Sequence, residues 1–263
     1  MADGASAELT DAVARIAAEA GALAMARWQD DFERWEKAPG NPVSAIDLEV
    51  DALLRTRLLA LDPEAGWLSE ETADNADRLA LPRLWVVDPI DGTRDYLRGR
   101  PGWAVSVALV DRGQPVLGVL DAPAMDLRWR AAVGQGAWLN GARRRAGDRR
   151  ALIGARVPTD QLPKNDIDLV AVAKPNSIAL RIGMVAADEA DLVATLRWGF
   201  EWDIAAAALI ASEAGATVTD AFGQPLRFNT PTAQAFGVLV TAPGIHAAAV
   251  NRLADRAKEY AQR

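Results

Sequence analysis

Hydrophobic positions along the chain first follow a helical spacing and then a strand pattern. Residues 8–29 and 46–61 repeat apolar side chains every three or four positions, so each segment predicts an amphipathic helix. Predominantly apolar runs predict buried strands at 84–88, 103–110 and 115–122. The short polar segment between the last two runs predicts a hairpin turn.

The second half of the chain alternates strand and helix patterns. Residues 131–141 predict a strand and a glycine-rich turn, 169–174 a strand, and 178–187 a helix. Residues 202–216 predict a further helix that ends at Gly215, because glycine commonly follows the last helical turn. A helix pair, antiparallel strands and then alternating strands and helices together predict a layered α+β fold.

The amino-acid composition limits which residues can carry out catalysis, but it says little about the fold. The 263 residues contain no cysteine and one histidine, so acid–base and metal chemistry falls to carboxylates, hydroxyls and water. The net charge of −7 argues against nucleic acid as a partner. A basic cluster lies in this acidic chain without interleaved aromatic residues, and we interpret it as a solvated loop. It consists of Arg143, Arg144, Arg145, Arg149 and Arg150.

Nothing in the sequence predicts a membrane partner or a signal peptide. The apolar runs fall short of the ~20 residues of a membrane span, and the first ten residues lack the basic and apolar regions of a signal peptide. We therefore expect a cytoplasmic protein.

An apolar run leads directly into DPIDGT, residues 88–93. The carboxylates of Asp88 and Asp91 can converge, and two like charges at close range repel unless a cation lies between them. A hard divalent cation accepts such oxygen ligands, including a backbone carbonyl such as that of Ile90. Amide groups near Gly92 and Thr93, at the start of a short helix, favour an anion such as phosphate. Taken alone, the stretch is equally well explained as an Asp-Pro turn.

Two other acidic stretches are unremarkable by themselves. Glu70 and Glu71 form a pair that is usually solvated, and Asp203 precedes an alanine-rich segment that it could cap. In combination and in this order, however, SEE, DPIDGT and WDIAAA resemble the motifs of the inositol monophosphatase superfamily. NPVSAIDLEVD, GQGAWLNG and EAGATVTDAFGQPLRFN extend the resemblance over residues 10–240.

This resemblance implies a fold, a reaction and a cofactor. The fold is a layered α-β-α-β-α sandwich of the sugar-phosphatase type. We expect an N-terminal α+β subdomain (1–150) with most metal ligands, and a C-terminal α/β subdomain (151–263) with Asp203 and the specificity segments. The family consists of magnesium-dependent, lithium-sensitive phosphatases, so two or three Mg²⁺ ions and inhibition by Li⁺ are expected. Family members occur as monomers and dimers, which makes a homodimer one expected state.

Roles also follow from the resemblance, residue by residue. The implied metal ligands are Glu70, Asp88, the carbonyl of Ile90, Asp91 and Asp203. The residues implied in catalysis are Glu70 and Thr93, which position and deprotonate the attacking water, and Asp47 beside the metal cluster. The implied phosphate-binding residues are Asp91, Gly92 and Thr93. The implied substrate residues are Lys37, Lys174, Ser177 and Arg181.

Three positions depart from the family pattern: Ser69 and Ala207 replace frequent glycines, and the run from Asn176 lacks another. None removes a ligand, so we interpret them as changes in packing or specificity.

The stretches around SEE and DPIDGT are most similar to the 3′(2′),5′-bisphosphate nucleotidase branch of the family. This favours adenosine 3′,5′-bisphosphate as the substrate, hydrolysed to AMP and phosphate. An inositol-1-monophosphatase or related sugar phosphatase shares every metal ligand and is the main alternative, and a non-catalytic metal-binding protein is a weaker one. Lys174 and Arg181 could meet a second phosphate or be ordinary surface charges. Trp198 could stack on adenine, although a packing role is favoured in a chain with nine tryptophans.

Overall fold

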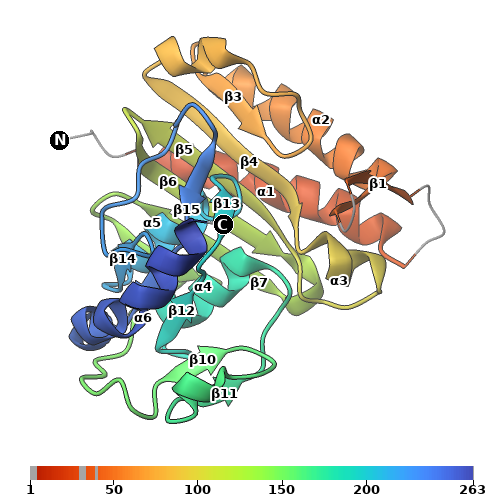
Figure 1. Cartoon of the computed structure of the whole chain (residues 1–263). Coiled ribbons are helices and arrows are strands. Elements are labelled where there is room, and N and C mark those ends of the chain that lie inside the picture. Colours follow the sequence, from red (N-terminus) through yellow and green to blue (C-terminus); the bar gives the residue numbers. More distant parts are fainter. Residues whose placement is uncertain (1–4, 30–33, 39–40, 263) are drawn as a thin grey trace.

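The computed structural model describes residues 5–29, 34–38 and 41–262, and the side chains of 5–29 and 45–262. A seven-stranded mixed sheet lies at its centre (Figure 1). β3 and β4 run parallel, and the other neighbouring strands run antiparallel. In spatial order the strands are β3 (Gly66–Ser69), β4 (Arg83–Asp91), β5 (Ala104–Asp111), β6 (Gln114–Ala122), β7 (Leu127–Ala132), β8 (Gly136–Leu139) and β9 (Ala142–Arg144).

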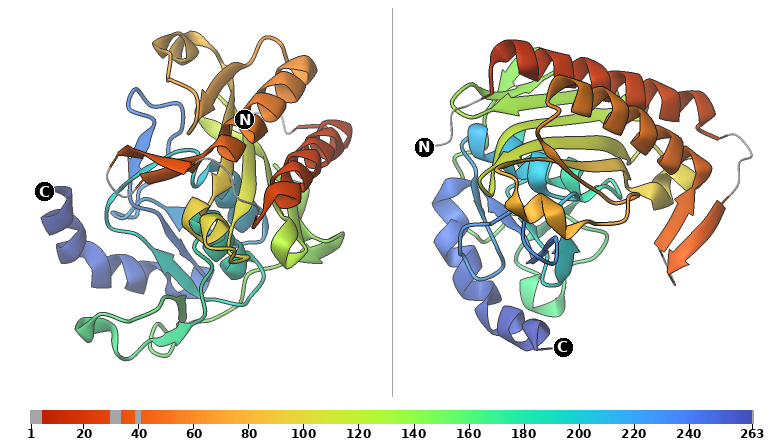
Figure 2. Two further views of the ribbon diagram at one scale, coloured as in Figure 1. Left: turned by 90° about the vertical axis from the view of Figure 1, so that its right-hand side faces the viewer. Right: turned by 90° about the horizontal axis from the view of Figure 1, so that it is seen from above.

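Strand β4 is buried on both faces, which explains the uninterrupted apolar run at 84–87. Successive side chains of a strand point to opposite faces. Trp85 and Val87 therefore pack with helices α1 (Ala7–Arg27) and α2 (Ala45–Leu61), while Leu84 and Val86 join the core on the other side. Figure 2 shows α1 and α2 side by side across one face of the sheet. A sheet covered on both faces cannot alternate apolar and polar residues.

The opposite face carries α4 (Ile178–Ala186) and α5 (Ala205–Glu213). Beyond them lies a three-stranded sheet, and the outermost layer is helix α6 (His246–Ala261). The second sheet has the order β12 (Leu192–Ala194), β16 (Leu239–Thr241) and β14 (Thr217–Thr219). The predicted α+β fold with α-β-α-β-α layers is confirmed.

Short elements complete the chain. The remaining strands are β1 (Arg34–Ala38), β2 (Asn41–Ser44), β10 (Arg156–Pro158), β11 (Val170–Val172), β13 (Trp198–Phe200) and β15 (Gln234–Phe236). The remaining helical turns are η1 (Ala76–Ala80), α3 (Thr93–Leu97), η2 (Pro123–Met125), η3 (Lys164–Asp166) and η4 (Pro243–Ile245). Among the described residues, none of the helices combines the length and the apolar character needed to cross a membrane.

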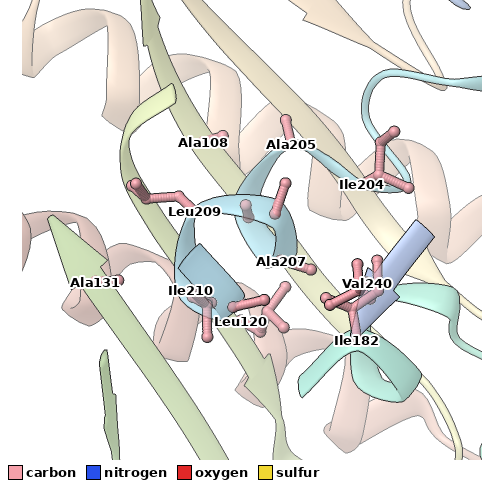
Figure 3. Close-up of a cluster of buried hydrophobic side chains, with 14 of the residues drawn as sticks. Ala108, Leu120, Ala131, Ile182, Ile204, Ala205, Ala207, Leu209, Ile210 and Val240 are labelled. Carbon is pink, nitrogen blue, oxygen red and sulfur yellow. The ribbon is translucent and has the colours of Figure 1, made fainter. Parts of the chain in front are cut away.

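Helix α5 lies in unusually close contact with the central sheet. Its first turn consists of alanines, and its side chains fill the core between the two sheets (Figure 3). A Cβ atom added to Gly118 of β6 would lie 2.6 Å from the carbonyl oxygen of Ala206. Glycine on the strand and small residues on the helix therefore allow the two backbones to approach, and this seating fixes the start of α5.

The predicted helices 8–29 and 46–61 correspond to α1 and α2, and Ser6 caps α1 by accepting a hydrogen bond from the amide of Leu9 at 3.1 Å. Two differences matter. The strand predicted at 84–88 continues to Asp91 through an irregularity in its pairing with β5, instead of ending in a turn at Pro89. Helix α6 was not predicted, although its buried residues Ala249, Leu253 and Ala257 recur every four positions, which is the spacing of an amphipathic helix.

Candidate active site

Parallel pairing of β3 and β4 brings the first two carboxylates together. Ser69, the last residue of β3, pairs with Val87, so Glu70 leaves β3 directly beside Asp88 of β4. The amide of Glu70 also donates to the carbonyl of Val87 at 3.3 Å. The two acids are 18 positions apart in sequence, and strand register alone makes them neighbours.

The third carboxylate comes from the other half of the chain. Asp203 lies just before α5, and one oxygen from each of Glu70, Asp88 and Asp203 falls within 4.8 Å of the others. Burial, and then the charge of Glu70, raises the pKa of Asp88 well above its ordinary value. Burial, and then Asp91 and Glu70, does the same to the pKa of Asp203. Such mutual repulsion is what a bound cation relieves.

Asp91 is held by the N-terminus of α4. Its carboxylate accepts hydrogen bonds from the hydroxyl of Ser177 at 2.5 Å and from the amide of Ala179 at 2.8 Å. Burial raises the pKa of Asp91, and these hydrogen bonds oppose the rise. Ser177, predicted as a substrate residue, is fully buried, where it holds Asp91 and accepts from the amide of Leu180.

The turn after β4 is fixed by its own hydrogen bonds. The amide of Ile90 donates to Asp88 at 3.0 Å, and the hydroxyl of Thr93 donates to the carbonyl of Ile90 at 2.9 Å. Gly92 has a φ of 97°, and a Cβ atom there would lie 2.7 Å from the carbonyl oxygen of Gly102. Only glycine accommodates both conditions, so the glycine after the second aspartate is a backbone requirement.

Two further predicted residues lie around this cluster. Asp47, in the first turn of α2, is buried, and its charge contributes to the raised pKa of Asp88. Lys37 lies on β1, and its side chain is outside the described part of the structure.

A cavity of about 690 Å³ opens above the acids. One part of its lining consists of Glu70, Asp88, Asp91, Asp203, Gly92 and Thr93. Another part is cationic and consists of Arg94, Lys174, Arg181 and Arg197. The cavity is therefore bipolar, with a site for cations beside a site for anions.

The predicted substrate residues Lys174 and Arg181 both line this cavity. Lys174 forms an ion pair with Asp160, with 2.8 Å between Nζ and Oδ2. Arg181 donates to the backbone carbonyls of Pro175 and Asn176, both at 2.8 Å. It therefore supports the segment that carries Lys174 as well as adding charge.

Sequence reasoning missed three residues here. Arg94 and Arg197 were overlooked, although Arg94 directly follows the DPIDGT motif. Asp51 was also missed. Its buried carboxylate accepts hydrogen bonds from the hydroxyls of Ser69 and of Thr72, the latter at 2.8 Å. Asp51 thus anchors the turn that carries Glu70. Its spacing of four from Asp47 on one helix was the available signal.

A second buried network ties the Glu70 side of the cavity to the Asp203 side. Arg78, which follows the SEE turn, donates to Asn229 at 2.6 Å and to the carbonyl of Thr230 at 2.9 Å. Glu201, two residues before Asp203, accepts from the amides of both Asn229 and Thr230. A charged residue is buried in this way only when it is fully hydrogen-bonded.

The residues present suit a hard divalent cation. All candidate ligands are oxygens, three of them converge, and no histidine or cysteine lies among them, which favours Mg²⁺ over Zn²⁺.

Comparison with known proteins agrees with this geometry. The model of the inositol monophosphatase family matches residues 5–262. The 3′(2′),5′-bisphosphate nucleotidase CysQ of Escherichia coli is 31% identical over 231 residues, covering 84% of this chain and 94% of the relative. The inositol-1-monophosphatase SuhB of Mycobacterium tuberculosis is 34% identical over 277 residues, covering 92% of each chain. The solved structure of Thermotoga maritima IMPase superimposes with a TM-score of 0.82 at 27% identity, covering 96% of this chain and 99% of that one. Fold, site and sequence agree, and the chain belongs to the inositol monophosphatase family.

Proposed function

We propose that this chain hydrolyses a phosphomonoester that carries a second phosphate, with adenosine 3′,5′-bisphosphate as the favoured substrate and AMP and phosphate as products. As a member of its family, the chain is a metal-dependent phosphoric monoester hydrolase. Nucleotidase and inositol monophosphatase relatives match it at similar identity. The choice of substrate therefore rests on the side chains of the cavity.

The observation that carries this proposal is the cationic lining of the cavity. A phosphate held at the acidic cluster would be neutralised by Mg²⁺ ions bound to these carboxylates, and the rest of an inositol monophosphate is uncharged. A second phosphate, in contrast, needs cationic donors of its own. Arg197 is an exposed residue, and its charge partly opposes the rise that burial causes in the pKa of Asp203. Among the described residues its guanidinium has no hydrogen-bond or ion-pair partner, so it is available to such a group.

The chain's residues divide the chemistry between them. Glu70, Asp88, Asp91, Asp203 and the carbonyl of Ile90 would hold the Mg²⁺ ions, which when bound lower the pKa of water and neutralise charge on the phosphate. Glu70 would accept the proton of the attacking water. Thr93 already donates its hydroxyl proton to Ile90, so the lone pairs of its oxygen can orient that water.

The buried surroundings of the cluster strengthen these interactions. Asp88 is almost fully buried, and its position is fixed by the amide of Ile90. Charged and polar groups that are already in position in a site of low dielectric need little reorganisation during the reaction. Such groups provide most of the stabilisation of a phosphoryl transition state.

The test compares rates on adenosine 3′,5′-bisphosphate, inositol-1-phosphate and fructose-1,6-bisphosphate with Mg²⁺, with EDTA and with added Li⁺. We expect the highest kcat/KM on the nucleotide, loss of activity in EDTA, and inhibition by Li⁺. Arg197→Gln should lower kcat/KM for the nucleotide by about 10- to 100-fold, because a hydrogen bond to a charged group contributes roughly 1.5–3 kcal/mol.

Arg144→Gln, which changes an exposed arginine outside the cavity lining, is the matched control and should leave kcat/KM for the nucleotide and for inositol-1-phosphate unchanged. A higher kcat/KM on inositol-1-phosphate than on the nucleotide would favour the alternative substrate and contradict the proposal.

A further inference from the structure

The cavity wall beside Asp203 carries two stacked aromatic rings. The rings of Phe200 and Trp202 have centroids 4.4 Å apart and planes inclined by 7°. Both residues line the cavity that contains the acidic cluster. Trp202 also packs against the core beneath α5, whereas Phe200 is 40% exposed. Phe200 is therefore the accessible ring of the stack.

The position of this pair relative to the charges is informative. Trp202 is the residue before Asp203, so the stack begins directly at the acidic cluster. Arg197, three residues before Phe200, lines the same cavity. The cavity therefore contains, within one segment of the chain, a carboxylate, an aromatic surface and a free guanidinium.

Another exposed aromatic residue of the same strand behaves differently. Trp198 is 55% exposed, lies outside the cavity lining and packs edge-on against Phe236, with 5.5 Å between ring centroids. This is the packing role favoured from the sequence. Both Trp198 and Phe200 of β13 are therefore exposed, but of the two only Phe200 lines the cavity.

We infer that Phe200, backed by Trp202, is the platform on which the base of a nucleotide substrate stacks. The inference deepens the proposed function and rests on it, because it assumes a nucleotide ester. An aromatic face suits a planar base and gives a polyol such as inositol no comparable contact. Stacking tolerates any base, since every base has a π-face. The site should therefore accept guanosine 3′,5′-bisphosphate nearly as well as the adenosine compound.

The experiment measures kcat/KM for adenosine 3′,5′-bisphosphate and for inositol-1-phosphate in the full chain with Mg²⁺. Phe200→Leu, which keeps an apolar side chain but removes the ring, should lower kcat/KM for the nucleotide by about 5- to 100-fold, mainly through KM. The same variant should leave the rate on inositol-1-phosphate unchanged. Phe200→Trp should restore nucleotide hydrolysis, and Trp198→Leu, the matched change on the same strand, should affect neither ester.

The outcomes separate this inference from the proposed function. If the nucleotide is the preferred substrate and Phe200→Leu lowers both esters equally or neither, the platform is refuted and the proposed function stands. If the unchanged protein prefers adenosine 2′-monophosphate, assayed alongside the two esters, and Phe200→Leu lowers that rate selectively, the platform stands and the bisphosphate assignment falls. If the unchanged protein hydrolyses inositol-1-phosphate but neither hydrolyses adenosine 3′,5′-bisphosphate nor binds AMP in calorimetry, both are overturned.

Discussion

Replacing Gly118 by alanine tests whether the seating of α5 on the central sheet controls the metal cluster. Gly118 lies in the middle of β6, and an added Cβ atom would lie 2.6 Å from the carbonyl oxygen of Ala206 and 3.1 Å from its Cα. Both are backbone atoms, so no side-chain rotation can relieve the contact. The helix must move as a unit, or the strand must bend.

The size of the movement can be worked from these distances. Ordinary contacts begin at 3.4 Å, so the first turn of α5 must shift by roughly 0.8 Å, and overpacking of this kind typically costs about 1–3 kcal/mol. Asp203 lies two residues before the start of α5 at Ala205, and its carboxylate must meet Glu70 and Asp88 within 4.8 Å. A misplacement of about 1 Å can lower the rate by about 100-fold.

Two measurements on the Gly118→Ala variant are required. Urea unfolding followed by tryptophan fluorescence should show a lower free energy of unfolding, and the Mg²⁺ concentration for half-maximal rate should rise as kcat falls. Gly199→Ala is the control for stability, because a Cβ atom at that strand position meets nothing within 4 Å. If Gly118→Ala unfolds at the same urea concentration as the unchanged protein and keeps its kcat, the close contact does not position Asp203 and the reasoning is wrong.

Three further predictions concern single carboxylates. Asp203→Asn should lower kcat by at least about 100-fold. In EDTA its unfolding temperature should be equal to or higher than that of the unchanged protein, because the substitution removes one of several carboxylates that repel one another. Near-normal turnover would exclude Asp203 as a metal ligand. Asp51→Ala should destabilise the fold by about 1–3 kcal/mol and raise the Mg²⁺ concentration needed for activity, because the hydroxyls of Ser69 and Thr72 lose their acceptor. Urea unfolding and Mg²⁺ titration measure the two effects. An unaltered Mg²⁺ requirement would mean that the position of Glu70 does not depend on Asp51. Burial raises the pKa of Asp121 from 3.8 to about 6, partly offset by Arg128. Between these values the folded chain holds a proton that the unfolded chain releases, so stability should fall by roughly 2 kcal/mol as pH rises from 4 to 6, and Asp121→Asn should flatten that dependence in urea unfolding measured at several pH values.

Local sequence was sufficient for much of the fold. The helices α1, α2, α4 and α5 and the strands β4, β5 and β6 follow from apolar spacing, because each buries a face or stripe that its own residues define. Several strands of three residues, such as β12 and β14, were not predicted in this way, since an apolar run of that length fits several structures.

For the site, the sequence by itself determined the chemistry: almost no histidine, no cysteine, and three acidic motifs whose order indicates the family. Only the tertiary structure decided how these groups work together. The register of β3 against β4 makes Glu70 and Asp88 neighbours. Helix α5 packs closely against β6 at Gly118, and Asp203, which precedes this helix, lies beside the other two carboxylates. The tertiary structure also shows that Ser177 donates a hydrogen bond to Asp91 and that Phe200 lines the cavity. Such contacts join residues far apart in the chain and depend on how layers pack, which no local pattern contains.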